Sequence, residues 1–355
     1  MARIKRKGTG MAKRKPFEIA GVKVAPGSRQ TVDVPVSSLA DHTPVHLSVH
    51  VAHGRKPGPV IFVSAAVHGD EVIGVEIVRR LLKSKSITGG MAGTLLAVPI
   101  VNTFGFLNHS RYLPDRRDLN RSFPGHPTGS MASRLAHIFM TEVVQRSDLG
   151  IDLHSAAIRR TNLPQLRLTS GSDRLRDLAD VFAAPVVMTS NLRDGSLRMA
   201  AEDAGVDVLL YEGGEGLRFD ELAAQSGVAG ILRVMNHLGM IGKKGVPRKR
   251  ADPLYCGDSS WYRAPAGGLF RGYQAVGDTV QPGTVMGAIA DPFGEVEDEV
   301  VSDKTGIIIG RTNMPVVYEG DALFHVAEAA RDKKVIQGMS LHLTTAPMFD
   351  EDEIL

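Results

Sequence analysis

The sequence predicts an α/β protein with a mixed, mostly parallel sheet flanked by helices, followed by a small all-β region. Two observations support this prediction. Up to about residue 242, short apolar β-branched runs alternate with helical patterns, as in parallel βαβ units. From Trp261 onward, only short β runs separated by Gly turns are present. The length of 355 residues fits about two domains.

The individual elements follow from these patterns in chain order. Residues 16–55 are expected to form short strands, marked by the alternation of Val45, Leu47, Val49 and Val51. A buried strand begins at Val60, and a helical pattern with an apolar side follows it to Leu82. Further strands are expected at residues 94–101, 149–153, 185–188 and 206–211. Further helices are expected at residues 130–146, 173–182, 196–204 and 219–238.

Shifts in composition divide the chain into four segments. Residues 1–15 form a flexible basic arm, and residues 16–245 form the α/β domain with its N-terminal strands. A basic Gly/Pro-bearing linker leads into a β domain at residues 246–335. Within this domain, segments 268–289 and 306–326 repeat weakly, which suggests a barrel-like sandwich. Residues 336–355 are expected to be an acidic, solvated tail.

The composition excludes several classes of function. The net charge is +3, so no large positive field indicates nucleic-acid binding. No apolar run is long enough to span a bilayer, and the basic arm lacks the apolar core of a signal peptide. Cys256 is the only cysteine, so an intrachain disulfide and a thiolate zinc cluster are excluded. We expect a cytoplasmic protein whose metal ligands, if present, are His, Asp or Glu.

Histidines and acids stand at the ends of predicted strands. His68, His154 and Glu212 each follow a strand, and side chains at the carboxyl ends of parallel strands converge above the sheet. Two histidines and one carboxylate form a known catalytic zinc set. The carboxylate ligand could be Glu71, Asp70 or Glu212, and proximity to His68 favours Glu71. The structural alternative is a strand, a Gly turn and a helix whose dipole attracts acids.

Asp152 lies two residues before His154, on the same strand face. Its carboxylate could orient the imidazole of His154 as a partner behind the metal ligand. An ordinary buried or edge acid is the alternative interpretation.

The long polar segment from residue 102 to residue 129 carries four arginines. Loops of this length in compact domains are usually functional, and arginine binds carboxylates and stabilises oxyanions. For Arg116 and Arg117 we prefer a surface salt-bridge role. Phosphate binding is disfavoured because no Gly-rich phosphate loop accompanies the arginines.

Several short motifs occur together in one order. They are His68-Gly69-Asp70-Glu71, Asn102 with Gly105-Phe106, Arg111, Asp118-Leu119-Asn120-Arg121-Ser122-Phe123-Pro124-Gly125, Asp152-Leu153-His154-Ser155 and Tyr211-Glu212-Gly213-Gly214. The joint pattern resembles the succinylglutamate desuccinylase/aspartoacylase family, a branch of the M14-like zinc carboxypeptidase superfamily. The resemblance covers about residues 16–330.

The resemblance implies roles for individual residues. His68, Glu71 and His154 would bind one Zn²⁺ per subunit, whereas Asp70 would support the turn. Glu212 matches the general base and acid, with Glu215 as its rival. The remaining implied roles are oxyanion stabilisation by Arg111 and binding of the substrate carboxylate by Asn120 and Arg121.

The resemblance also implies an activity and a domain type. The expected reaction is zinc-dependent hydrolysis of the amide bond of a small N-acyl amino acid. We expect no nucleic-acid or membrane partner, and a homo-oligomer is compatible with the resemblance. The alternatives are a metallocarboxypeptidase acting on short peptides and a non-catalytic binding or carrier protein. The C-terminal domain resembles the biotinyl/lipoyl-like fold. Lys304 lacks the Met-Lys-Met surround of a carrier lysine, so we expect it to be unmodified. The domain would cover the mouth of the site or form an oligomer interface.

Overall fold

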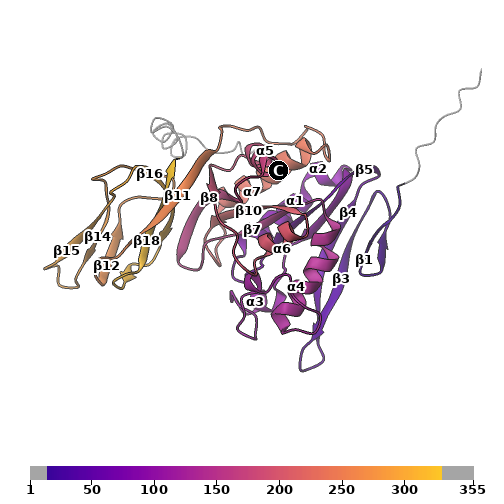
Figure 1. Cartoon of the computed structure of the whole chain (residues 1–355), viewed down its shortest axis with the longest axis horizontal. Helices are drawn as coiled ribbons and strands as arrows, with labels where there is room; N and C mark the ends of the chain where they lie inside the picture. The colour runs from indigo at the N-terminus through magenta and orange to yellow at the C-terminus, as the bar shows by residue number, and fades with distance from the viewer. Residues whose placement is uncertain (1–13, 330–355) are drawn as a thin grey trace, which may run out of the picture.

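The computed structural model describes residues 14–329, and all structural statements below concern that part of the chain. The basic arm and the acidic tail therefore lie mostly or wholly outside the described residues. Figure 1 shows helices packed on both sides of one long sheet, with an all-β region at the end opposite β1 and β3. No helix within residues 14–329 is long and apolar enough to cross a membrane.

The α/β part begins with strands and then alternates strands with helices. Its strands are β1 (Phe17–Ile19), β2 (Val22–Val24), β3 (Ser28–Ser38), β4 (Pro44–His53), β5 (Lys56–Ala65), β6 (Ala92–Val98), β7 (Leu149–His154), β8 (Arg160–Leu168), β9 (Val186–Thr189) and β10 (Asp207–Gly214). Its helices are α1 (Ile73–Lys83), α2 (Lys85–Thr88), α3 (Thr103–Leu107), α4 (Met131–Glu142), α5 (Asp173–Phe182), α6 (Leu197–Asp203) and α7 (Glu221–His237), with 3-10 turns η1 (Leu119–Arg121) and η2 (Val144–Arg146). The predicted alternation of strands and helices is thus confirmed.

The central sheet has twelve strands in the order β13-β16-β18-β11-β9-β8-β10-β7-β5-β6-β4-β3. Strands β10, β7, β5 and β6 run parallel to one another, as do β8, β9 and β11 where they pair. Strand β10 pairs with β8 in the antiparallel direction. The strand pairs at both ends of the sheet are antiparallel as well, for example β11 with β18 and β3 with β4. The sheet is mixed, as expected, but its parallel character is confined to the interior.

Two apolar layers cover the two faces of the sheet. On one face, α1, α5 and α7 bury residues such as Ile77, Phe182 and Ile231 against the strands. On the other face, α4 and α6 pack with β1 to β4 around residues such as Phe139 and Leu47. These layers leave the carboxyl ends of β5, β7 and β10 to be covered by loops.

The C-terminal part contains only strands within the described residues. They are β11 (Leu254–Arg263), β12 (Gly268–Gly272), β13 (Thr279–Val280), β14 (Val285–Ala290), β15 (Glu297–Val301), β16 (Gly306–Thr312), β17 (Val316–Val317) and β18 (Ala322–Ala329). Strands β15, β14, β12 and β17 form a second sheet, whereas the others extend the central sheet through β9 and β8. Each half of the sequence repeat contributes strands to both sheets: β12, β14 and β17 lie in the second sheet, whereas β13, β16 and β18 lie in the central sheet. A separate apolar core lies among these strands.

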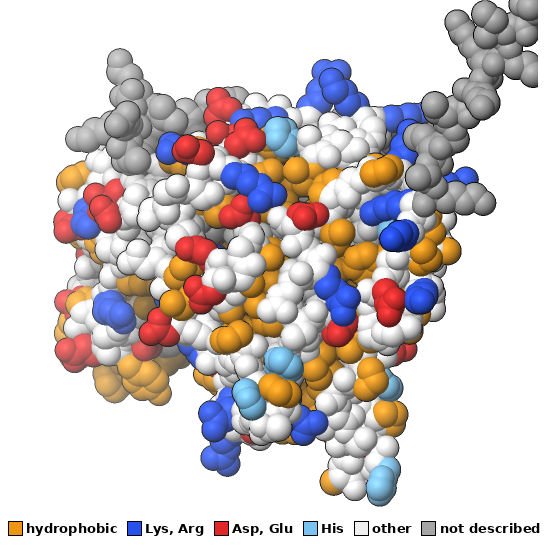
Figure 2. All heavy atoms as spheres, turned by 45° about the vertical axis from the view of Figure 1, so that its right-hand side comes forward, with side chains coloured by type: hydrophobic (Ala, Val, Ile, Leu, Met, Phe, Trp, Pro, Cys, Tyr) orange, Lys and Arg blue, Asp and Glu red, His pale blue; other side chains and the backbone are white. Residues whose placement is uncertain are grey.

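Charged side chains are mixed on the surface. Figure 2 shows basic and acidic groups interspersed over one face, without a continuous patch of either sign. This distribution agrees with the small net charge of the sequence.

Candidate active site

A tight turn after β5 carries the first pair of site residues. The strand ends at Ala65, Ala66 adopts a left-handed φ of 49°, and α1 begins only at Ile73. Glu71 therefore precedes the helix and does not lie in its first turn, where the structural alternative would have placed it. A Cβ on Gly69 would lie 2.0 Å from the carbonyl carbon of Gly105, so the turn packs directly on the backbone of α3.

The third residue of this group comes from the neighbouring strand. Strand β7 runs parallel to β5, with Ala65 opposite Leu153, and it ends at His154. His68, Glu71 and His154 are all buried, with exposed fractions of 4%, 3% and 3%. Parallel pairing of two strands thus brings together residues more than eighty positions apart in the sequence.

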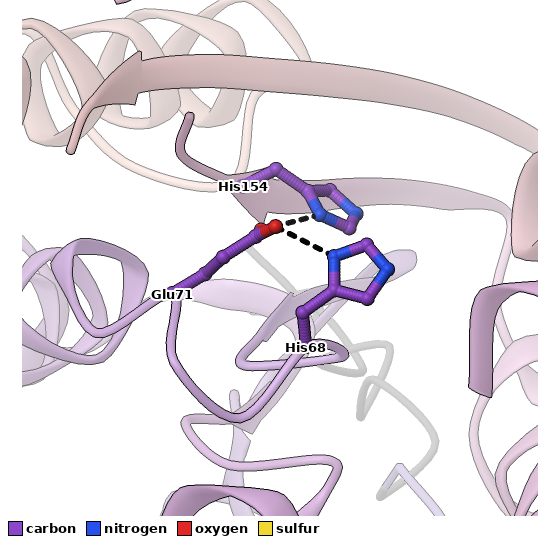
Figure 3. Close-up of side chains that lie close together, drawn as sticks. All are labelled: His68, Glu71 and His154. Atoms are coloured by element: carbon purple, nitrogen blue, oxygen red, sulfur yellow. Dashed lines mark hydrogen bonds and ion pairs between the residues drawn. The ribbon is translucent and has the colours of Figure 1, made fainter. Parts of the chain in front are cut away.

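The three side chains point toward one another (Figure 3). His68 Nδ1 lies 2.6 Å from Glu71 Oε1, and His154 Nδ1 lies 2.7 Å from Glu71 Oε2. The backbone N–H of Ser155 also donates to Glu71 Oε2 at 3.1 Å. One donor atom from each residue can be chosen so that all lie within 4.8 Å of one another.

Each imidazole also contacts a carboxylate on its other side. His154 Nε2 lies 2.7 Å from Asp152 Oδ2, and the Ser64 hydroxyl donates to Asp152 Oδ1 at 2.7 Å. His68 Nε2 lies 3.2 Å from Asp118 Oδ1. These carboxylates fix both rings with Nδ1 directed at Glu71, the arrangement typical of carboxylates behind metal-bound histidines.

The buried charges in this cluster determine its protonation. Burial by itself would raise the pKa of Glu71, but His68 and His154 hold that pKa well below its usual range. Burial would lower the pKa of His154, but Asp152 and Glu71 outweigh it and raise the pKa well above its ordinary value. Glu71 is therefore a carboxylate at neutral pH.

The donor set fits a divalent cation. Two imidazole nitrogens and one carboxylate oxygen, all buried and within reach of one another, form the ligand set of catalytic zinc sites with an open position. Asp70 does not belong to this set. Its Oδ1 is buried without a hydrogen-bond partner, and its backbone carbonyl accepts from the N–H groups of Val72 and Leu217.

Arg111 lies beside the cluster. Its Nη2 donates to Asp118 Oδ2 at 2.9 Å, and its Nη1 lies 3.5 Å from Glu71 Oε1. Asp118 therefore contacts both His68 and Arg111, and these two groups hold the pKa of its carboxyl well below the usual range despite burial. Arg111 is a fixed cation directed at the same small volume as the two imidazoles.

Glu212 and its sequence rival Glu215 lie in different surroundings. Glu212 Oε2 accepts from the Asn162 amide at 2.9 Å, and Arg167 Nε lies 3.5 Å from Glu212 Oε1. Glu215 instead accepts from the backbone N–H of Arg159 and from Asn313, both at 2.9 Å. Of the two acids, only Glu212 lines the cavity described next.

Asn120 and Arg121 lie on η1. The side-chain oxygen of Asn120 accepts from the Leu197 N–H at 2.8 Å, which leaves the amide NH₂ for another partner. Arg121 Nη1 donates to the backbone carbonyl of Asn120 at 2.5 Å. No carboxylate among the described residues forms an ion pair with the guanidinium of Arg121.

A single cavity of about 480 Å³ brings the predicted site residues together. Its lining includes His68, Glu71, Arg111, Asn120, Arg121, His154 and Glu212. His109 and His126, which are close to these residues in the sequence, are not among the lining residues. Another cavity of about 720 Å³ is lined by glycine-rich turns near Gly54, Gly89 and Gly239 and has no carboxylate in its lining.

A family model matches residues 57–238, the part of the chain that carries these residues. That model describes the succinylglutamate desuccinylase/aspartoacylase catalytic domain. The chain belongs to this family.

Individual relatives support the same assignment. The N-alpha-acetyl-L-2,4-diaminobutyric acid deacetylase of Halomonas elongata is 29% identical over 287 residues, which cover 77% of this chain and 83% of the relative. A succinylglutamate desuccinylase/aspartoacylase structure from Rhodobacter sphaeroides superposes with a TM-score of 0.76 at 25% identity, covering 86% of this chain and 96% of that one. The product-bound structure of the ectoine utilization protein EutE (DoeB) from Ruegeria pomeroyi has a TM-score of 0.75 at 22% identity, covering 89% and 99%. At 22% identity, the likeness between this chain and the Ruegeria structure concerns the fold alone.

Beyond the family motifs, the cavity contains residues that the sequence did not single out. Arg160, Asn162 and Arg167 come from β8, and Trp261 and His325 come from the C-terminal strands β11 and β18. Strand β8 was not predicted from the sequence. The alternation of Leu166, Arg167 and Leu168 was the available signal, but Pro164 argued against a strand.

Proposed function

We propose that this protein is a zinc-dependent hydrolase that cleaves the amide bond of a small N-acyl amino acid, with one zinc ion per subunit. The observation that carries the proposal is one cavity lined by a His-Glu-His donor set, a separate carboxylate and several arginines. Membership of the desuccinylase/aspartoacylase family and the deacetylase activity named for the Halomonas relative support the same reaction class.

The proposed ligands are His68, Glu71 and His154. Zinc in such a site polarises a substrate carbonyl and makes water a nucleophile at neutral pH. Asp152 and Asp118 hold the two imidazoles in the orientation that this role requires.

Glu212 is the proposed general base and acid. It would take a proton from the attacking water and later deliver that proton to the leaving amine. Asn162 and Arg167 fix the carboxylate of Glu212 in the cavity. Arg111, held by Asp118 and Glu71, would stabilise the negative charge that develops on the acyl oxygen.

Asn120 and Arg121 are the proposed binding groups for the α-carboxylate of the substrate. The amide NH₂ of Asn120 and the guanidinium of Arg121, which forms no ion pair with a carboxylate within residues 14–329, can both donate to a substrate carboxylate. This contact would place the scissile amide between Glu212 and Arg111.

We propose the C-terminal β region, residues 246–335, as a domain of biotinyl/lipoyl-like type that closes one side of the cavity. Trp261 and His325 supply part of the wall. Lys304 Nζ pairs with Glu328 Oε1 at 2.7 Å, which supports an unmodified lysine. Such a wall would limit the size of the substrate.

The test is a hydrolysis screen with the zinc-loaded full chain. N-acetyl and N-succinyl amino acids are compared with short unblocked peptides at equal concentration, and amine release is measured. Turnover of N-acyl amino acids well above that of peptides supports the proposal. Faster cleavage of peptides would indicate a carboxypeptidase, and no turnover of either class would contradict hydrolysis.

A further inference from the structure

Strand β8 lies between the proposed base and the C-terminal region. On one side it pairs antiparallel with β10, where Gln165 lies opposite Glu212. On its other side, the first residues of β8 pair with β16, with Asn162 opposite Gly310, and the last residues pair with β9. Figure 1 shows β8 at the border between the α/β part and the all-β part. The first half of β8 is therefore held by the C-terminal region.

Within residues 14–329, the two side chains that bind the Glu212 carboxylate both come from β8. The Asn162 amide donates to Oε2 at 2.9 Å, and Arg167 Nε lies 3.5 Å from Oε1. Arg167 belongs to the half of β8 that pairs with β9 of the α/β part, whereas Asn162 belongs to the half that pairs with β16. One contact of the proposed base thus depends on the C-terminal region.

Gly310 leaves the space in which the Asn162 side chain lies. A carboxylate only accepts hydrogen bonds, so it is Nδ2 of Asn162 that faces Glu212. A Cβ on Gly310 would lie 2.8 Å from the other amide atom, Asn162 Oδ1, which is closer than a Cβ tolerates. The next contacts, 3.4 Å from the Thr161 carbonyl oxygen and 3.5 Å from the His325 Cβ, are ordinary ones. A methyl group at position 310 would therefore push first on the amide of Asn162.

A buried glutamine fastens β16 to β8 beside Gly310. Gln165 is completely buried, and its Nε2 donates to the backbone carbonyl of Ile309 at 3.3 Å. The neighbouring Pro164 has no backbone N–H to offer to β16. The pairing of β16 with β18 is irregular between Ile308 and Gly310, so the glutamine binds a carbonyl at a bulge. The place of β16 along β8 is thereby fixed at the level of Glu212.

Further hydrogen bonds hold the start of β8 to the residue that follows β16. The backbone N–H of Asn313 donates to the carbonyl of Arg159 at 2.8 Å. The Asn313 amide donates to Thr161 Oγ1 at 3.2 Å and to Glu215 Oε2 at 2.9 Å. The contact between β8 and β16 is therefore tied on both sides of Asn162.

We propose that the C-terminal β region positions the proposed base, because β16 sets the place of Asn162 and Asn162 orients the carboxylate of Glu212. The inference rests on the proposed N-acyl amino acid hydrolysis and gives the C-terminal region a role beyond that of a wall. A base must lie within hydrogen-bond reach of the water from which it takes a proton, so its direction matters. Asn162 is a positioning residue in this scheme, since it acts on the reaction through Glu212.

Gly310→Ala tests the proposal from outside the cavity lining. The substrate is N-acetyl-L-alanine or N-succinyl-L-alanine, whichever the zinc-loaded wild-type chain hydrolyses faster. The methyl group should displace the Asn162 amide, so kcat should fall about 10- to 100-fold, as for a lost hydrogen bond to a charged group. KM and zinc content should stay within about twofold of wild type, because the proposed carboxylate-binding groups and zinc ligands are untouched. Asn162→Ala should show the same loss.

A second glycine of the C-terminal region provides the matched control. Gly257 lies on β11, and a Cβ there would meet nothing within 4 Å. Gly257→Ala should therefore keep kcat within about twofold of wild type. An equal loss in both glycine variants would show a general effect of the substitution and would contradict the proposal.

A double-mutant cycle distinguishes positioning from general damage. If Gly310→Ala acts through Asn162, the combined variant should be no slower than Asn162→Ala alone, because both substitutions remove the same contact. Losses that multiply would show that Gly310 acts by another route and would overturn the proposal. A loss in KM instead of kcat would show that Asn162 binds the substrate, and would overturn it as well.

The side-chain amide of Asn162 gives a readout that needs no turnover. In the NMR spectrum of the isotope-labelled, zinc-loaded full chain, its signal is the one that Asn162→Ala lacks. A charged acceptor strengthens the hydrogen bond of this amide, so Glu212→Gln and Gly310→Ala should both shift the signal. Gly257→Ala should leave the signal in place.

The outcomes separate the two proposals. No hydrolysis of either substrate by wild type, with an Asn162 signal that responds to Gly310→Ala, would overturn the reaction and leave the control of Asn162 by β16 standing. Normal kcat in Gly310→Ala, or an Asn162 signal that does not respond to this substitution, would overturn the positioning role and leave the reaction standing.

Discussion

The carboxylate of Asp152 lies behind His154, with its Oδ2 2.7 Å from Nε2 on the side of the ring opposite Glu71. Ser64 donates to the other oxygen of Asp152, so the carboxylate itself is held in one orientation. The strand β7 carries both Asp152 and His154, on one face, and is completely buried. A rigid strand therefore sets the direction of the imidazole.

Asp152→Asn should weaken zinc binding while leaving the fold intact. The amide cannot provide the negative charge that raises the basicity of His154, so affinity should fall about 10- to 100-fold. Competition with a chromogenic chelator measures this change. The matched control is Asp177→Asn, because Asp177 is exposed and pairs with His237 at 3.1 Å, away from the cavity lining. Equal zinc affinity in the two variants would remove Asp152 from this role.

His154→Ala should cost the metal itself. The substitution removes one of three protein donors and leaves Glu71 with one imidazole instead of two. Metal analysis after dialysis should give far less than one zinc per chain for this variant. The His109→Ala protein should keep its zinc, because His109 lies outside the cavity lining. Full zinc occupancy of the His154→Ala protein would argue against the proposed ligand set.

The sequence predicted the parts of the site that depend on local order along the chain. His68, His154 and Glu212 follow apolar runs, and parallel strands place their carboxyl ends at one edge, as β5, β7 and β10 do here. The loop residues Arg111, Asn120 and Arg121 were assigned from the family resemblance, and the structure places them in the same cavity. Their catalytic roles stay predictions.

The parts that were missed depend on long-range pairing. Strand β8 contains Pro164, and its partner on one side changes from β16 to β9 between Asn162 and Gln165. A proline is tolerated at that point because the hydrogen-bond ladder is interrupted there. Trp261 and His325 meet only through the register of β11 and β18, which the sequence pattern does not specify. Asp118 appeared within a motif, but its double contact with His68 and Arg111 required coordinates.

Glu212→Gln should retain zinc and lose most turnover. Glutamine is similar in shape and can still contact Asn162, but it cannot accept the proton of the attacking water, so kcat should fall about 10²- to 10⁴-fold. Glu215→Gln is the control, because this acid follows three residues later and binds Arg159 and Asn313 instead. Near-normal kcat in Glu212→Gln, or a loss as large in Glu215→Gln, would overturn the assignment of the base.

His325 should make the protein less stable as the pH falls from about 6.5 to about 4. Burial, then the charge of Arg167, lowers the pKa of this imidazole to about 4 in the folded protein, whereas an unfolded histidine titrates near 6.5. Between these values the unfolded chain binds a proton that the folded chain does not, so unfolding is favoured as the pH decreases. Thermal unfolding midpoints measured at pH 7, 5.5 and 4 should therefore decline more steeply for wild type than for His325→Gln. The glutamine does not titrate and can still pair with Ser259, which lies 2.8 Å from His325 Nε2. Parallel curves for the two proteins would show that His325 is not held neutral by its surroundings.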